Sequence, residues 1–206
     1  MTNARVSMLT VLAASCLALA PSAARSQDAS MAMPKPGAEM KAIAPIFGVG
    51  AATWKGDVSA GGMGPNSPAT TSHGKVATHT MLGGLWYACD VEDTYGTGKE
   101  AMTWKGHMLV GWDSNAKAYK GSCVDNMGAM ASFDGSLDGT KFTLVTPSEV
   151  MMMGQMMKDR LTWDMADPKA IKFTDEHQVS GGDWMVVESA TMMAAAKPMA
   201  SKAPTK

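Results

Sequence analysis

The chain has few cysteines, almost no net charge and no long apolar run. Its 206 residues include 18 Lys and Arg against 19 Asp and Glu, which gives a formal net charge of −1. Nucleic-acid binding draws on an excess of positive charge, so this balance argues against DNA or RNA as a partner. The N-terminal apolar stretch, residues 6–20, is shorter than the roughly 18 to 20 residues that a transmembrane helix needs. We therefore expect no nucleic-acid partner and no transmembrane segment.

Motifs of several enzyme classes are also missing. The sequence contains no His-Glu-x-x-His, no paired Cys-x-x-Cys and no Gly-x-Ser-x-Gly, the patterns of zinc hydrolases, zinc sites and serine hydrolases. Charged residues near expected turns, such as Lys55, Asp57, Glu92 and Asp93, are interpreted as a solvated rim. We predict that the protein is not an enzyme and that it needs no metal or other cofactor.

The N-terminus has the pattern of a secretory signal peptide. Arg5 precedes the apolar stretch 6–20, and small residues follow at Ser22 and Ala24. We expect cleavage after Ala24 and a periplasmic or secreted product. A lipoprotein site at Cys16 is the alternative, which the apolar residues continuing past Cys16 disfavour.

The two ends of the remaining chain look unlike its middle. Residues 25–44 are rich in Ala, Met, Pro and Lys and are predicted to be a linker, with one helical turn near residues 38–43. Residues 192–206 have the same composition and are predicted to be a disordered tail. The folded domain is therefore expected over residues 45–191.

The regular spacing of turn-forming residues inside this domain predicts an all-β fold. Turn-forming Gly, Asn, Asp and Pro residues recur between short stretches rich in Thr, Val, Trp, Tyr and Phe. In residues 101–113, Met102, Trp104 and Met108 share one face of a strand. About nine or ten such strands with short loops favour a closed, antiparallel, up-and-down barrel like that of the lipocalins. Residues 149–158 are the best helix candidate.

A family resemblance points the same way. The sequence Leu-Gly-Gly-Leu-Trp at residues 82–86 is followed by Met-Thr-Trp at 102–104, Gly-Trp-Asp at 111–113, Asp-Asn-Met-Gly at 125–128 and Phe-Asp-Gly-Ser-Leu at 133–137. This order resembles the bacterial family catalogued as domain of unknown function 1579, over residues of about 45–191. The resemblance implies a calycin barrel, related in shape to the lipocalins, and brings no assigned catalytic residues.

The aromatic residues allow two interpretations. The six tryptophans either fill and plug the barrel or line a cavity for a small apolar ligand. Under the second interpretation, the protein is a non-enzymatic binding module for a small hydrophobic ligand. Its predicted lining residues are Trp86, Met102, Trp104, Met127, Met130 and Trp163.

Methionine supports a second functional hypothesis. The chain has 21 Met, and five of the seven residues 151–157 are Met. Thioethers bind Cu(I) in exported proteins, so Cu(I) handling in the cell envelope is one alternative. Methionine is also a flexible filler of apolar surfaces. A ligand-free structural or interaction module is the third possibility.

Cysteine and histidine contribute little to the prediction. Cys89 and Cys123 are expected on strands that flank the strand at 101–113, about 9 to 10 Å apart, which exceeds the span of a disulfide. Two buried thiols are therefore the default. His177 lies near Asp175 and Glu176 and is interpreted as part of a solvated edge.

Overall fold

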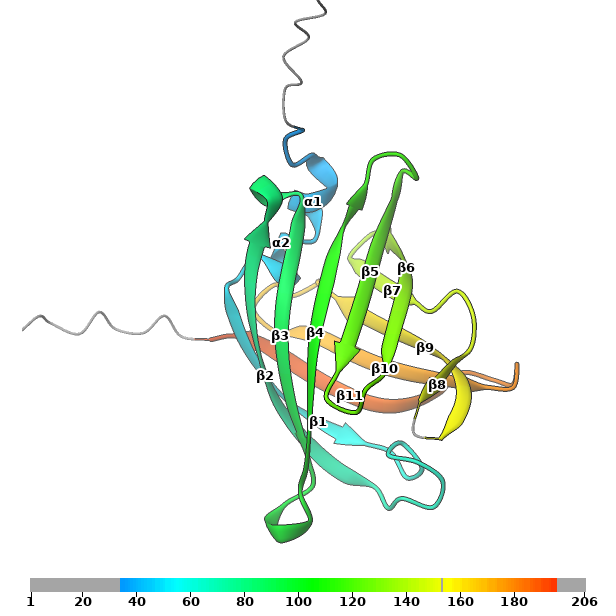
Figure 1. Cartoon of the computed structure of the whole chain (residues 1–206). Coiled ribbons are helices and arrows are strands. Elements are labelled where there is room, and N and C mark those ends of the chain that lie inside the picture. Colours follow the sequence, from blue (N-terminus) through cyan, green and yellow to red (C-terminus); the bar gives the residue numbers. More distant parts are fainter. Residues whose placement is uncertain (1–33, 153, 196–206) are drawn as a thin grey trace, which may run out of the picture. The chain divides into compact units, whose positions relative to one another are not determined.

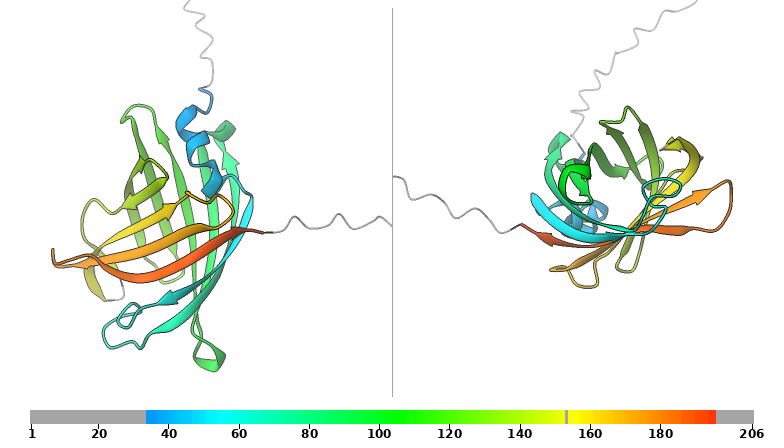
Figure 2. Two further views of the ribbon diagram at one scale, coloured as in Figure 1. Left: turned by 180° about the vertical axis from the view of Figure 1, so that it is seen from behind. Right: turned by 90° about the horizontal axis from the view of Figure 1, so that it is seen from below.

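Eleven antiparallel strands, two of which share one position, form a closed barrel of ten positions in the computed structural model, which describes residues 34–152 and 154–195. The strands are β1 (Ala51–Val58), β2 (Thr70–Met81), β3 (Trp86–Tyr95), β4 (Met102–Asp113), β5 (Ala118–Asp125), β6 (Met130–Asp138), β7 (Lys141–Val145), β8 (Val150–Met152), β9 (Gln155–Asp164), β10 (Ile171–Val179) and β11 (Met185–Ala194). Each strand follows its predecessor around the barrel, and β11 pairs with β1 to close it (Figures 1 and 2). The predicted up-and-down barrel is confirmed.

The short strand β8 is the one departure from a simple meander. Both β7 and β8 pair with β9, β7 along its second half and β8 along its first. The chain between β7 and β8 contains Pro147, which has no backbone N–H to donate to a ladder. The two strands thus occupy one position in the barrel, interrupted at the proline. Within the expected helix at residues 149–158, residues 150–152 belong to β8 and residues 155–158 to β9 instead, with Gly154 in the left-handed region at φ 78°.

Two short helices close one end of the barrel, where a linker was expected. Helix α1 spans Ala38–Ala42 and α2 spans Ala44–Phe47. Ile43 between them is 0% exposed, and Met40 is 3% exposed. The helical turn predicted near residues 38–43 is present as α1, but residues 38–44 are part of the folded domain and not of a linker, because Met40 and Ile43 are buried in the barrel. Residues 25–33 lie outside the described part of the chain.

The C-terminal boundary also shifts. Residues 192–194, predicted to begin the tail, belong to β11, and Met192 is 7% exposed in the barrel core. This stretch is held by strand pairing, since Ala52 of β1 pairs with Ala194. The backbone N–H of Ala195 donates to the carbonyl of Ala51. The remaining predicted tail, residues 196–206, lies outside the described residues, as does the predicted signal peptide.

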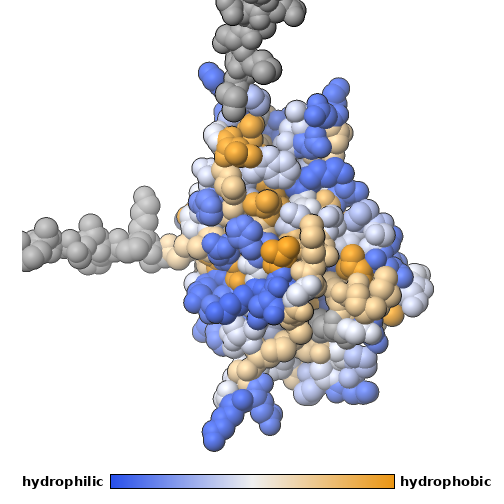
Figure 3. Space-filling model, viewed as in Figure 1, coloured by the Kyte–Doolittle hydropathy of each residue, from blue (hydrophilic) through white to orange (hydrophobic). Residues whose placement is uncertain are grey.

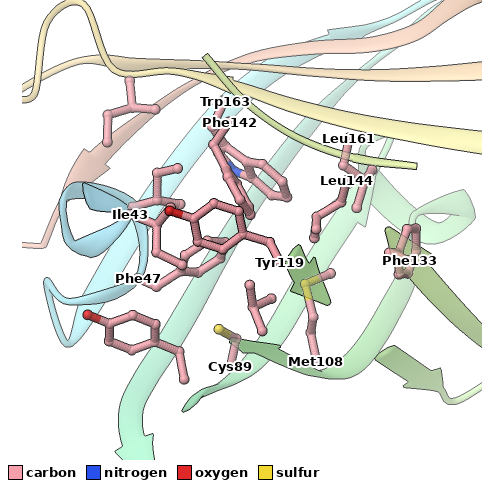
Figure 4. Packing of buried hydrophobic residues seen from close by; sticks show 14 of the residues in the cluster. Ile43, Phe47, Cys89, Met108, Tyr119, Phe133, Phe142, Leu144, Leu161 and Trp163 are labelled. Carbon is pink, nitrogen blue, oxygen red and sulfur yellow. The ribbon is translucent and has the colours of Figure 1, made fainter. Parts of the chain in front are cut away.

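Aromatic rings fill the end of the barrel beneath the helices. Phe47 of α2 contacts Phe142 at a ring-centroid distance of 5.8 Å and Trp163 at 5.5 Å (Figure 4). Tyr119 lies edge-on to Phe142 at 5.1 Å. The hydroxyls of Tyr87 and Tyr119 donate to the backbone carbonyls of Met40 and Glu39 in α1. Packing and hydrogen bonding together hold the helices in place.

The two described cysteines are free and buried, as the strand order predicts. In the register of the sheet, Cys89 of β3 and Cys123 of β5 both pair with Met108 of β4 and are separated by that strand. Burial raises the pKa of the Cys89 thiol to about 11 and that of the Cys123 thiol to about 12.

Two connections contain short 3-10 turns, Leu82–Gly84 and Gly98–Glu100. Within residues 34–152 and 154–195, no helix has the length and apolar character that a bilayer span requires. On the face shown in Figure 3, hydrophilic and hydrophobic residues are interspersed.

Candidate functional site

The barrel encloses a cavity of about 230 Å³. Its walls come from the inward-facing positions of the strands, and its inner end reaches Ile46 and Phe47 of the helical plug. Five of the six predicted lining residues border it: Met102, Trp104, Met127, Met130 and Trp163. Most other lining side chains are apolar, which is typical of a small-molecule site.

Trp86, the sixth predicted residue, is absent from the cavity wall. It precedes Tyr87, which is buried, and so has the opposite, outward parity on β3. The Trp86 ring covers Gly111, its cross-strand partner on β4, where a Cβ would lie 2.5 Å from the ring carbons. The prediction of Trp86 as a lining residue of the cavity is therefore wrong.

Methionines surround the cavity mouth. They come from the β1–β2 loop, the start of β4, the β5–β6 turn and the β8–β9 hairpin: Met63, Met102, Met127, Met130, Met151 and Met152. Three of them are more than half exposed, namely Met127 at 61%, Met130 at 68% and Met151 at 59%. Six methionines from four segments of the chain thus meet at one opening, and we call these six residues the methionine rim.

Two tryptophans in the cavity wall donate to carboxylates. The indole N–H of Trp54 donates to Oδ2 of Asp93 at 3.2 Å, and that of Trp104 donates to Oδ2 of Asp125 at 3.1 Å. Oδ1 of Asp125 also accepts from the backbone N–H groups of Met127 and Ala129, which fixes the β5–β6 turn. Asp93 was expected on the solvated rim. It is 3% exposed because its parity on β3 points it inward.

A bulge in the sheet brings a further acid into the interior. The register between β10 and β11 shifts at Asp175, so Val187 and Glu188 are both buried and both border the cavity. Oε1 of Glu188 accepts a hydrogen bond from the Ser72 hydroxyl at 2.5 Å. Burial and the nearby charge of Asp93 raise the pKa of the Glu188 carboxyl, and burial likewise raises the pKa of Asp93.

Three polar side chains from β9 and β10 complete the interior. The ligand atoms of Asp159, Asp175 and His177 lie within 4.8 Å of one another, so this group could hold a divalent cation. Burial raises the pKa of Asp159 to about 6, and burial followed by the charge of Asp159 raises the pKa of Asp175 well above its ordinary value. His177 is 7% exposed, so its interpretation as part of a solvated edge is wrong.

The acidic interior was not predicted, although the alternation of side chains along the strands carries the signal. Asp159 shares its parity with Leu161 and Trp163, both of which are buried. Glu188 likewise shares its parity with Ala190 and Met192 in β11, both of which are buried. A polar residue at a core-facing position of a strand is uncommon without a partner or a ligand. This criterion would have identified Asp159 and Glu188.

The comparisons with known proteins agree with the barrel. One similar solved structure is that of Rv2717c from M. tuberculosis, with a TM-score of 0.51 and 9% sequence identity over 79% of this chain and 100% of that chain. At this identity the likeness concerns the fold. No curated protein matches the sequence. The model of the family described as a protein of unknown function, DUF1579, matches residues 35–194. The chain therefore belongs to the DUF1579 family.

Proposed function

We propose that the protein is an exported, non-enzymatic binding module whose barrel interior holds a small, mostly apolar ligand. The cavity is the observation that carries this proposal. It has a volume of about 230 Å³, mainly apolar walls and a few convergent polar groups. Sites for small molecules share the apolar walls and the few polar groups, and a volume below their usual range restricts the ligand to a compact one.

The arrangement of the two barrel ends supports binding over a filled structural module. The aromatic packing around Phe47, Phe142 and Trp163 is confined to the end that the helices close. At the other end, the methionine rim borders the cavity with flexible side chains. Unbranched thioether side chains adapt to apolar groups of different shape, which suits the entrance of a ligand site.

A cavity-filling variant tests the proposal. The half-buried Ala131 lines the cavity, and Ala131→Trp would occupy its space. Ala77→Trp is the matched control, because Ala77 is exposed on β2. We expect apolar compounds to quench the tryptophan fluorescence of the native protein and of the control, and to lose this effect in Ala131→Trp. Equal quenching in all three proteins would overturn the proposal.

Export is the second part of this proposal and rests on the pattern of residues 1–24. Cell fractionation of the native host should place the processed protein outside the cytoplasm, whereas a chain without residues 1–24 should stay inside. Retention of the full-length chain in the cytoplasm would contradict export.

The methionine rim favours Cu(I) binding as an alternative function. Thioethers from Met127 and Met130 lie at one opening together with the β8–β9 methionines. A Cu(I) competition titration of the native protein, compared with Met127→Leu/Met130→Leu, tests it. Uptake that the leucine variant loses would favour the alternative, and no uptake by the native protein would end it.

A further inference from the structure

The cavity wall carries a marked excess of acidic side chains. Four inward-facing carboxyls form a band across β3, β9, β10 and β11, and we call Asp93, Asp159, Asp175 and Glu188 the acidic band. The sheet register places Asp175 opposite Glu188 across β10 and β11, and it places Asp159 opposite His177 across β9 and β10. Among the described residues that border the cavity, His177 is the only one able to carry a positive charge.

Several oxygens of the acidic band lack a donor. Oδ1 of Asp93, Asp159 and Asp175 is buried without a hydrogen-bond partner among the described residues, and Nε2 of His177 lies 3.6 Å from Oδ1 of Asp175. Asp93 is 3% exposed and Asp159 is 8% exposed, and both border the cavity. A buried carboxyl oxygen without a donor is costly, and burial accordingly raises the pKa of these groups towards the protonated form. A positive charge supplied by a ligand would favour the ionised form and remove the cost.

Aromatic rings border the same space. Trp54 and Trp104 contribute to the cavity wall, as do Tyr95 and Phe173. Trp54 is joined to the acidic band directly, through its hydrogen bond to Asp93. Aromatic faces attract cations, and the attraction is stronger where water is excluded. The wall thus combines apolar surface for a hydrocarbon body with carboxylates and rings for a positive charge.

We propose that the ligand of this cavity is an organic cation, with an apolar body along the hydrophobic wall and a protonated amine at the acidic band. This inference rests on the proposed ligand-binding function and names its substrate class. The amine would donate to the unpartnered oxygens of Asp93, Asp159 and Asp175.

A bare metal ion would use fewer of the side chains that border the cavity than an organic cation would. Asp159, Asp175 and His177 could bind one, but Asp93 and Glu188 lie outside that group. An ion would also leave most of a cavity of about 230 Å³ without an occupant. An amine attached to an apolar body uses both the remaining carboxyls and the hydrophobic wall.

Calorimetric titration of the purified full-length protein with octylamine, octanol and octanoate isolates the contribution of the head group. These probes share one apolar chain and carry a positive, a neutral and a negative group. We expect octylamine to bind at least about tenfold more tightly than octanol, and octanoate to bind most weakly. Equal affinity for octylamine and octanol would overturn the cation inference while leaving the proposed function intact. Binding of none of the three would overturn both.

Variants and a metal titration complete the test. Asp93→Asn/Glu188→Gln should weaken octylamine binding by about tenfold or more and leave octanol binding unchanged. Asp90→Asn is the matched control, because Asp90 has a 65% exposed side chain on the outer face of β3. Its affinity for octylamine should equal that of the native protein. One-to-one binding of Zn²⁺ or Mn²⁺ by a protein that does not bind octylamine would overturn the inference in favour of a metal.

Discussion

The indole ring of Trp54 lies directly over Gly74, its cross-strand partner on β2. A Cβ on Gly74 would lie 2.0 Å from Cζ2 of Trp54. The missing side chain therefore provides the space in which the ring can reach Asp93, to which it donates a hydrogen bond. A glycine in one strand thus positions a cavity-lining tryptophan of another.

Gly74→Ala should displace Trp54 and destabilise the fold by about 1 to 3 kcal/mol through overpacking. Gly121→Ala is the control, since its Cβ would meet ordinary contacts at 3.4 Å. Urea unfolding should show a lower free energy of unfolding for Gly74→Ala than for Gly121→Ala. Equal values would contradict the close packing of Trp54 on Gly74.

The helical plug should contribute to stability. Ile43 is 0% exposed between α1 and α2, so Ile43→Ala should lower the free energy of unfolding by about 2 to 5 kcal/mol. Val49→Ala, at a side chain 39% exposed just after α2, should change it by less than about 0.5 kcal/mol. Similar urea midpoints for the two variants would mean that the helices contribute little to the core.

Stability should fall as the pH rises through the titration of Asp159. Burial raises the pKa of this carboxyl from 3.8 to about 6, so the folded protein retains a proton that the unfolded chain releases. The stabilisation is complete below about pH 4 and is lost as the pH rises through about 6, a change of roughly 3 kcal/mol. Asp175 faces Asp159, and its pKa is raised as well. Thr146 and His177 are the other polar neighbours of Asp159.

Asp159→Asn tests this dependence because the amide stays neutral. The variant should lose less stability than the native protein between pH 5 and pH 8. Asp134→Asn, an exposed site paired with Lys120, should keep the native dependence. Hydrogen bonds lower the pKa of exposed carboxyls such as Asp113 and Asp164. These groups make the stability rise with pH, and they do so at more acidic pH. A native stability that increases from pH 5 to pH 8 would contradict the account.

Cys89 and Cys123 should resist alkylation in the folded protein. Both thiols are buried, and burial raises their pKa to about 11 and about 12, so little thiolate is present at neutral pH. Peptide mass spectrometry after iodoacetamide treatment should find both unmodified in buffer and both modified in denaturant. Rapid modification in buffer would contradict their burial.

Local patterns predicted the barrel well because strand alternation and turn residues repeat along the whole domain. Trp104 and Trp163 face the interior on the parity that the sequence indicates. The helical plug was harder to predict, since the burial of Ile43 depends on rings contributed by strands distant in the sequence. The hairpin at residues 149–158 was obscured because methionine has no strong preference between strand and helix.

The candidate site could be predicted only in part for a related reason. The sequence shows that lining residues such as Met102 and Met130 are hydrophobic, but it does not show which end of the barrel they border. The acidic band assembles from four strands, and the bulge that brings in Glu188 arises from pairing between β10 and β11. Charge alone suggested a solvated rim for Asp93, whereas its parity with Cys89 and Val91 placed it inside.

The tryptophan indole N–H signals in a nitrogen–proton correlation spectrum test the central claim most directly. Trp54 and Trp104 border the cavity, whereas Trp86 covers Gly111 on the outer face and Trp184 stacks against Arg160, at 4.2 Å from the ring centroid. On titration with octanol, we expect the signals of Trp54 and Trp104 to shift while those of Trp86 and Trp184 stay in place. Shifts confined to Trp86 and Trp184 would place the ligand outside the barrel and contradict binding in its interior.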